Sequence, residues 1–208
     1  MTWLLEKEIK RELPKEWKGI VPTEAFFRES QEIVEKAKEE DIILRILGGL
    51  SIAIHCQEHR EFAQKLGRIG TGVIEGQEYS DIDYVSYRNQ REKIKELFDK
   101  IGYAKRRATL STAASERQIY YHPKGWFYVD VFFDKLLVAN HPIDFKGRLE
   151  LDCPTITVTD MLLEKIQMWE AFSIKDLKDC LLLLKAHDIK EKSEKESIDV
   201  PYIAKLLA

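Results

Sequence analysis

The sequence has little cysteine. Its 208 residues include only Cys56, Cys153 and Cys180, which are odd in number and far apart. This excludes the disulfide framework of a small secreted domain and favours a reducing, cytoplasmic compartment. No apolar run approaches membrane-spanning length, and charge appears at Glu6, before the apolar region of a signal peptide could form. We therefore expect a cytoplasmic protein without a membrane partner.

An excess of positive charge is also missing. The 33 Lys and Arg residues stand against 36 Asp and Glu residues, which gives a formal net charge of -3. The chain therefore lacks the overall positive charge that is typical of nucleic-acid-binding proteins. Local basic patches are compatible with this composition. No internal repeat is visible. The length fits one domain, or a main domain with a small appendage, and is enough to bury a core without disulfides.

Three regions differ in their apolar patterning. Residues 1–40 have helical spacing and predict N-terminal packing helices. Residues 41–155 contain short β-prone runs, and the glycine-rich stretch 57–79 within them predicts a mobile loop. Residues 156–208 return to helical spacing and predict a C-terminal helical segment. We expect an α+β (mixed α/β) fold with a mixed β-sheet and flanking helices.

The pattern also predicts individual elements. Helices are expected at residues 3–12, 23–40, 50–56, 91–101, 159–169 and 173–186, with a last short helix from about 199. The run from Ser173 to Asp176 predicts a capping box at the start of the helix at 173–186. Strands are expected at residues 42–47, 81–87, 106–111, 117–122 and 126–133. Residues 136–158 predict edge strands or an irregular connection, and the charged stretch 190–197 predicts a solvated loop.

Acidic side chains mark two of the predicted strands. Because side chains alternate across a strand, Asp81 and Asp83 project from the same face. Asp130 lies in the strand at 126–133, among β-branched and aromatic residues. Carboxylates are the ligands that hard cations such as Mg²⁺ or Mn²⁺ prefer. An acid-x-acid triplet alone is common on protein surfaces, so this hypothesis depends on its context.

That context is a glycine pair at the end of the first predicted strand. Gly48 and Gly49 follow an apolar run and precede a predicted helix that carries Ser51. Such a pair is most often an ordinary turn, but bare backbone amides at the start of a helix can also cradle phosphates. Together with the aspartates, the bend indicates an enzyme that handles nucleoside triphosphates and binds their phosphates at Gly48, Gly49 and Ser51.

Charged residues of the C-terminal region give weaker signals. Lys165 falls on the apolar stripe of its predicted helix, so its ammonium group either reaches the water or enters a cleft that binds phosphate. Lys175, Asp176 and Asp179 begin the next helix, and a solvated helix face explains them equally well.

Histidines near the glycine-rich stretch invite a zinc hypothesis. His55, Cys56 and His59 are close in sequence, but no second Cys/His pair follows at ligand spacing. The sequence alone therefore does not favour zinc.

The combination of motifs resembles the nucleotidyltransferase-like AbiEii toxin family. The resemblance spans about residues 40–190 and rests on the run from Leu44 to Ala53, on Ser80-Asp81-Ile82-Asp83, on the run from Thr159 to Gln167, and on Lys175-Asp176-x-x-Asp179. That family belongs to the polymerase-β-type nucleotidyltransferase superfamily. The resemblance implies a nucleotidyltransferase-like sheet, Asp81, Asp83 and Asp130 as metal ligands, and functional positions at Lys165, Lys175, Asp176 and Asp179.

The resemblance also implies an activity. A member of this family would move a nucleoside monophosphate from a nucleoside triphosphate to an acceptor hydroxyl, such as one on tRNA, as a toxin that has a separate antitoxin protein as partner. The alternatives are a transferase for an antibiotic or another small-molecule acceptor and a non-catalytic binding protein that keeps the fold. One departure is that Gln77-Glu78-Tyr79 lacks the basic residue often found before Asp-x-Asp. This departure weakens the neutralisation of triphosphate charge unless Arg60, Lys65 or Arg68 substitutes for the missing residue.

Overall fold

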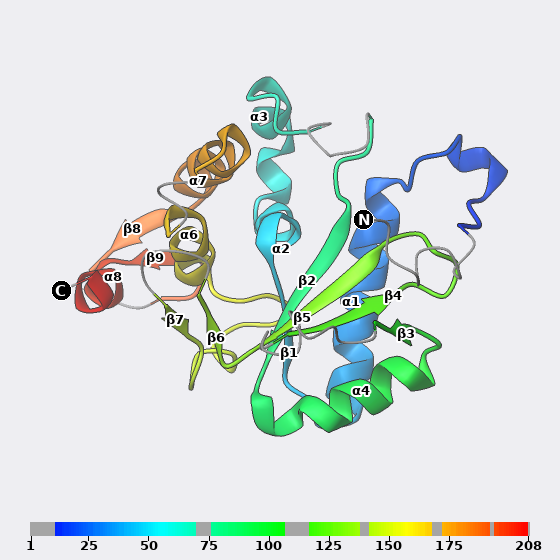
Figure 1. Cartoon of the computed structure of the whole chain (residues 1–208). Coiled ribbons are helices and arrows are strands. Elements are labelled where there is room, and N and C mark those ends of the chain that lie inside the picture. Colours follow the sequence, from blue (N-terminus) through cyan, green and yellow to red (C-terminus); the bar gives the residue numbers. More distant parts are fainter. Residues whose placement is uncertain are drawn as a thin grey trace.

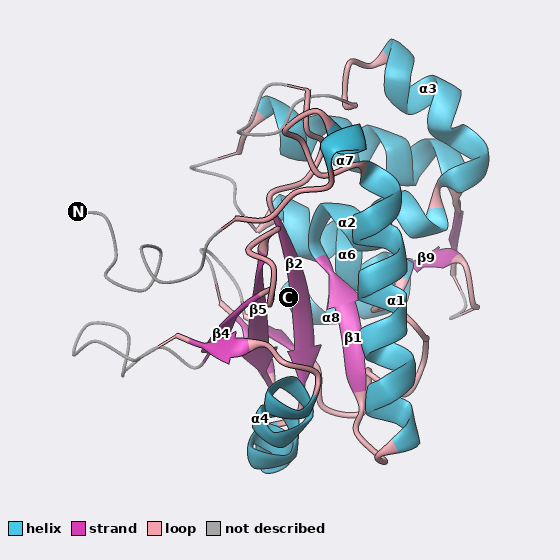
Figure 2. Cartoon of the chain, turned by 90° about the vertical axis from the view of Figure 1, so that its right-hand side faces the viewer, coloured by secondary structure: helices cyan, strands magenta, loops and turns pink. Residues whose placement is uncertain are grey.

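The computed structural model describes residues 11–69, 76–106, 117–137, 142–167, 172–191 and 194–207. Its centre is a five-stranded sheet in the order β1-β2-β5-β4-β3. The strands are β1 (Leu44–Leu47), β2 (Asp81–Ser86), β3 (Ala104–Lys105), β4 (Arg117–Tyr121) and β5 (Tyr128–Phe133). The pair β2/β5 is parallel and the other three pairs are antiparallel, so the sheet is mixed. Figures 1 and 2 show β1, β2 and β5 side by side.

Helices and short strands surround this sheet. The α-helices are α1 (Thr23–Glu39), α2 (Gly48–His55), α3 (Arg60–Lys65), α4 (Arg91–Lys100), α6 (Val158–Ile166), α7 (Ile174–Ala186) and α8 (Val200–Leu207). Within the described ranges, three short 3₁₀ helices cover Lys15–Trp17, Gln57–His59 and Arg88–Gln90. Two small sheets pair β6 (Lys135–Leu136) with β7 (Ile143–Asp144) and β8 (Asp188–Lys190) with β9 (Ser197–Asp199).

Alternation along the central strands gives the sheet two different faces. Ile82 and Tyr84 of β2, together with Val129 and Val131 of β5, are buried in one core cluster with residues of α1 and α4. The residues between them, such as Asp81, Asp83 and Asp130, therefore project from the opposite face. One face of the sheet is thus covered by helices, and the other presents carboxylates.

A second core cluster joins the C-terminal elements to the sheet. It packs Leu47 of β1 and Ile52 of α2 against Met161 and Leu163 of α6 and Leu183 of α7. Figure 1 shows α6, α7, α8 and the small β8/β9 sheet gathered on one side of the central sheet. This packing fixes the position of α6 and α7 relative to the start of α2.

The outer edge of β1 is covered by the segment that precedes α6. The amide of Ile46 donates to the carbonyl oxygen of Pro154 at 2.9 Å, and the amide of Ile156 donates to that of Ile46 at 3.1 Å. Ile46 and Thr155 form an isolated parallel bridge. Thr157 then caps α6 by accepting from the amide of Asp160.

The fold class predicted from the sequence is confirmed, because a mixed sheet is flanked by helices and followed by helices. The predicted capping box at the start of α7 is also present, between Ser173 and Asp176. Among the described residues, no helix is long and apolar enough to cross a membrane.

Two local predictions were wrong. The first helix after β1 begins at Gly48 itself rather than after the glycine pair. The first part of the expected loop 57–79 is helical, with a 3₁₀ turn and α3, because Ala63 packs into the second core cluster with support from Phe62. The helix expected at 3–12 and the strand expected at 106–111 lie mostly outside the described residues.

We predict that Phe98→Ala strongly destabilises the fold. The Phe98 side chain is fully buried, and its ring stacks on Tyr120 with centroids 4.2 Å apart. Emptying such a site lowers the free energy of unfolding by about 3–5 kcal/mol, which urea denaturation would measure. Leu184→Ala on the exposed side of α7 is the control, with an expected change within about 0.5 kcal/mol. Equal effects of the two substitutions would contradict this account of the core.

Candidate active site

Three aspartates meet on the open face of the central sheet. Asp81 and Asp83 project from β2, and Asp130 projects from β5. The parallel pairing of these strands places Asp83 directly beside Asp130. The structure therefore brings together the three carboxylates that the sequence singles out.

The aspartates line a cavity of about 430 Å³. Its other walls are basic and aromatic side chains, among them Arg106, Arg117 and Tyr128. Arg117 donates from Nη1 to Oδ2 of Asp130 at 3.2 Å. The site thus combines clustered negative charge with positive charge on the neighbouring strand β4.

Crowding changes the proton affinity of these carboxylates. Burial raises the pKa of Asp83 well above its ordinary value, and the charges of Asp81 and Asp130 raise it further. Burial also raises the pKa of Asp130, to about 6, although the charge of Arg117 opposes this rise. The three side chains repel one another when ionised, so a cation among them would relieve this repulsion.

One atom of this cluster has no partner within the described part of the chain. Oδ1 of Asp130 is buried and accepts no hydrogen bond there, whereas Oδ2 is bound by Arg117. An unpaired buried carboxylate oxygen is unfavourable. Together with the all-oxygen donor set, it fits a hard divalent ion such as Mg²⁺ or Mn²⁺.

The glycine bend lies against the same cluster. Gly48 has a φ of +75°, and a side chain there would place its Cβ 3.0 Å from Oδ2 of Asp83. A Cβ on Gly49 would lie 2.5 Å from Nη2 of Arg68. Both positions therefore exclude a side chain, one because of Asp83 and the other because of Arg68.

The amide of Gly48 is occupied by a carboxylate from α6. It donates to Oε2 of Glu164 at 3.0 Å. The bend thus holds an anionic group in this structure, as the start of a helix favours.

Ser51 has a different place from the one expected. Its side chain is fully buried, and its hydroxyl donates to the carbonyl oxygen of Gly48 at 2.8 Å. In this conformation Ser51 shapes the bend from behind, and a contact between its hydroxyl and phosphate stays a prediction.

The sequence left open whether the ammonium group of Lys165 reaches the water or points into a cleft. In the structure it points inward. Its side chain is 10% exposed, and Nζ lies 3.8 Å from Glu164, 3.4 Å from Asp176 and 3.5 Å from Asp179. Burial alone would lower the pKa of Lys165, but the three carboxylates raise it above its ordinary value. Lys165 therefore keeps its charge.

A smaller cavity, of about 230 Å³, connects Lys165 to the aspartates. Its walls include Asp83, Glu164, Lys165 and Asp176. Lys175 also belongs to this region, because its pKa is lowered by burial and by the charges of Arg68 and Lys165, while Asp179 and Asp81 oppose that change.

Two of the three basic residues that could replace the missing one, Arg60 and Arg68, pair with carboxylates outside the aspartate cluster. Arg68 is buried and forms an ion pair with Asp179, and Arg60 pairs with Glu78 at 3.0 Å. Lys65 is exposed on α3. The basic groups that do line the aspartate cavity are Arg106 and Arg117.

Sequence reasoning missed Arg106, Arg117 and Glu164. The signal for Arg117 is alternation, because it shares a strand face with Ile119 and Tyr121, which also line the cavity. Glu164 precedes Lys165 on α6, where most residues are buried, so no periodic pattern marks it in the sequence. Only its hydrogen bond with the amide of Gly48 shows that it belongs to the site.

Comparisons with known proteins concern the overall fold. No protein-family model matches the chain, and no curated protein matches it. Among solved structures, the chain is similar to the antibiotic-resistance factor ANT(2'')-Ia, with 12% identity and a TM-score of 0.45 over 77% of this chain and 82% of that one. It is also similar to the lincosamide antibiotic adenylyltransferase LnuA in its lincomycin-bound form, with 16% identity and a TM-score of 0.42 over 77% of this chain and 98% of that one.

A third similar structure is the Cid1 poly(U) polymerase, with 17% identity and a TM-score of 0.33 over 87% of this chain and 43% of that one. These identities and TM-scores are too low to assign a function to this chain.

We predict a pH-dependent effect of Asp130→Asn. Burial raises the pKa of Asp130 from 3.8 to about 6 in the folded protein. Between these two pH values the folded protein binds more protons than the unfolded chain. The free energy of unfolding therefore falls as the pH rises through this window. In metal-free buffer, the effect of Asp130→Asn on the free energy of unfolding should therefore be more stabilising above pH 7 than near pH 4, by about 1–3 kcal/mol.

Urea denaturation at both pH values with EDTA measures this difference. Asp188→Asn, at an exposed site in β8, is the control and should have the same small effect at both values. A pH-independent effect of Asp130→Asn would contradict the raised pKa.

Proposed function

We propose that the chain is a metal-dependent nucleotidyltransferase, which moves a nucleoside monophosphate from a nucleoside triphosphate to an acceptor hydroxyl. The observation that carries the proposal is the convergence of Asp81, Asp83 and Asp130 beside the Gly48-Gly49 bend. Nucleotidyl transfer requires clustered carboxylates next to a place for phosphates.

The carboxylates of Asp81, Asp83 and Asp130 would hold Mg²⁺ or Mn²⁺. The raised pKa values of Asp83 and Asp130 and the unpaired Oδ1 of Asp130 support this assignment. When bound, the ion supplies neutralisation of the charge on the phosphates and alignment of the reacting oxygens.

Groups on α2, α6 and α7 would hold the triphosphate. The amides of Gly48 and Gly49 open α2, and Lys165 lies in the cavity that also contacts Asp83. Asp176 and Asp179 position the Lys165 ammonium group, and Lys175 adds a second cation near the cleft. Ser51 supports the bend through its hydrogen bond to Gly48. Phosphate at the Gly48 amide would replace the carboxylate of Glu164.

The reaction exchanges a phosphoanhydride bond for a phosphoester bond. The acceptor oxygen forms a bond with the α-phosphorus, the bond from that phosphorus to the bridging oxygen breaks, and pyrophosphate leaves with the electron pair. Asp130 would help to activate the acceptor hydroxyl by accepting its proton. Arg117 holds Asp130 in place from β4.

The acceptor in this proposal is an RNA hydroxyl, such as one on tRNA. Arg106 and Arg117 in the aspartate cavity give a local positive charge that suits an acceptor with phosphates of its own. The resemblance to the AbiEii family adds the role of a toxin that works beside an antitoxin protein. The runner-up is an antibiotic or other small-molecule hydroxyl, which the net charge of -3 favours.

We predict that ATP or CTP with Mn²⁺ or Mg²⁺ raises the melting temperature. A ligand that binds only the folded state stabilises it by mass action. The double variant Asp81→Asn, Asp83→Asn should lose this shift, whereas Asp144→Asn, at an exposed site on β7, should keep it. Absence of any shift in the unmodified protein would support a non-catalytic binding protein instead.

We predict that labelled nucleotide is transferred to RNA in a reaction that needs Asp83. Incubation with α-labelled nucleoside triphosphates and either total RNA or a panel of hydroxyl-bearing antibiotics measures the transfer. Asp83→Asn should lower the rate by at least about 100-fold, since charge stabilisation at such a site contributes on this scale. Label on a small molecule and not on RNA would overturn the RNA acceptor and favour the runner-up, and label on neither would count against catalysis.

A further inference from the structure

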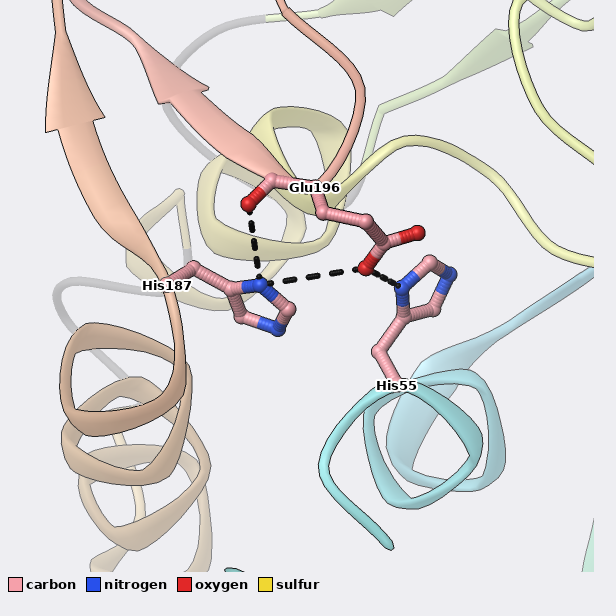
Figure 3. A group of neighbouring side chains, drawn as sticks. All are labelled: His55, His187 and Glu196. Atoms are coloured by element: carbon pink, nitrogen blue, oxygen red, sulfur yellow. Dashed lines mark hydrogen bonds and ion pairs between the residues drawn. The ribbon is translucent and has the colours of Figure 1, made fainter. Parts of the chain in front are cut away.

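Two histidines and a glutamate that are distant in the sequence meet in the structure. None of the three lines the aspartate cavity. His55 is the last residue of α2, His187 follows the end of α7, and Glu196 precedes β9. Figure 3 shows both imidazole rings turned toward the carboxylate of Glu196. One potential ligand atom from each residue lies within 4.8 Å of the other two.

The distances within this group suit a small cation. Oε2 of Glu196 lies 2.7 Å from Nδ1 of His55 and 3.8 Å from Nδ1 of His187. Zinc ligands sit about 2.0–2.2 Å from the ion, so two ligands of a tetrahedral site lie about 3.3 Å apart. Small side-chain rotations would bring the three atoms to that spacing.

The outer side of His55 has the partners that a metal-binding imidazole needs. Its Nε2 lies 2.6 Å from Oγ1 of Thr155 and 3.6 Å from Oδ2 of Asp152. A proton on Nε2, donated to these buried oxygens, would leave Nδ1 able to bind an ion in place of its present contact with Glu196. An oxygen partner on the second ring nitrogen is the usual second layer of histidine metal sites.

The ligand atoms differ in their access to water. The side chains of His55 and His187 are 7% and 5% exposed, whereas that of Glu196 is 47% exposed. The histidines are therefore held by packing, and the carboxylate closes the group from the solvent side. Glu196 has a φ of +60°, a conformation unfavourable for a residue with a side chain.

His187 has neighbours on both ring nitrogens. Its Nδ1 lies 3.1 Å from the carbonyl oxygen of Glu196, and its Nε2 lies 3.8 Å from Sγ of Cys56. Ligation through Nδ1 would replace the contact with the carbonyl oxygen and leave the proton on Nε2, which faces Cys56.

We propose that His55, His187 and Glu196 form a structural site for a divalent transition-metal ion of the zinc class, with water as a fourth ligand. Two imidazoles and one carboxylate are a ligand set that Zn²⁺ accepts. The ligands are scattered over 141 positions, which is why the spacing of His55, Cys56 and His59 in the sequence does not predict the site.

The site would act on the cleft through two helices. α2 begins at the Gly48 bend and ends at His55, and α7 carries Asp176 and Asp179 in its first turns and ends at Ala186, directly before His187. An ion bound at one end of both helices would fasten them to each other and to the Glu196 turn. This role is structural and does not depend on the proposed nucleotidyl transfer.

The test uses the full chain with Asp81→Asn and Asp83→Asn, so that the aspartate cluster does not contribute bound metal. After equilibration with Zn²⁺ and gel filtration, about one equivalent of zinc should remain, measured by plasma mass spectrometry. Co²⁺ in place of Zn²⁺ should give the d–d absorption of a tetrahedral site, and Zn²⁺ should raise the melting temperature relative to EDTA.

Glu196→Gln and His187→Gln should each lose most of the bound zinc and the cobalt spectrum, with the fold checked by circular dichroism. Glu194→Gln, in the same turn as Glu196, and His59→Gln, a histidine close to His55 in the sequence, are the controls, and both should retain the zinc and the cobalt spectrum. Zinc retention equal in all variants, or no retention and no zinc-induced rise in melting temperature in the parent, would overturn the site and leave Glu196 as a partner of two histidines only.

Discussion

The repulsion among three carboxylates is the constraint around which the central sheet is organised. Asp81, Asp83 and Asp130 are held on one face by the parallel pairing of β2 with β5, and burial and mutual charge raise the pKa of Asp83 and Asp130. Such a cluster is unfavourable for folding unless something else stabilises it. The buried core on the opposite face, where Ile82 and Val129 pack with α1 and α4, supplies that stabilisation.

A second charged group links the C-terminal helices to this sheet. Lys165 is surrounded by the carboxylates of Glu164, Asp176 and Asp179, and Glu164 also accepts from the amide of Gly48. The group therefore joins α6 and α7 to the start of α2. Each carboxylate also has a partner besides Lys165, namely the Gly48 amide for Glu164, the Ser173 hydroxyl for Asp176 and Arg68 for Asp179. The cluster can therefore be buried, whereas loss of Lys165 would leave carboxylates without their shared cation. The aspartate cluster and the carboxylates around Lys165 meet at the smaller cavity, which both Asp83 and Lys165 line.

Local sequence patterns predicted those features that depend on neighbours along the chain. Alternation placed Asp81 and Asp83 on one strand face, and the capping box placed the start of α7. Features set by tertiary contact were not predictable in this way. Ser51 is turned into the bend by the helix that begins at Gly48, and Arg117 reaches Asp130 only through the pairing of β4 with β5. Periodicity carries no information on such pairings.

The segment before α6 has a consequence for self-association. A strand at the border of a sheet offers unpaired amides and carbonyls to any other extended chain. Ile46 has both its groups engaged by Pro154 and Ile156, and the opposite border of the sheet is β3, which has only two residues. The same short stretch that leads into the cap of α6 therefore also blocks the addition of a foreign strand next to β1. Protection against aggregation and placement of Lys165 are thus properties of one piece of backbone.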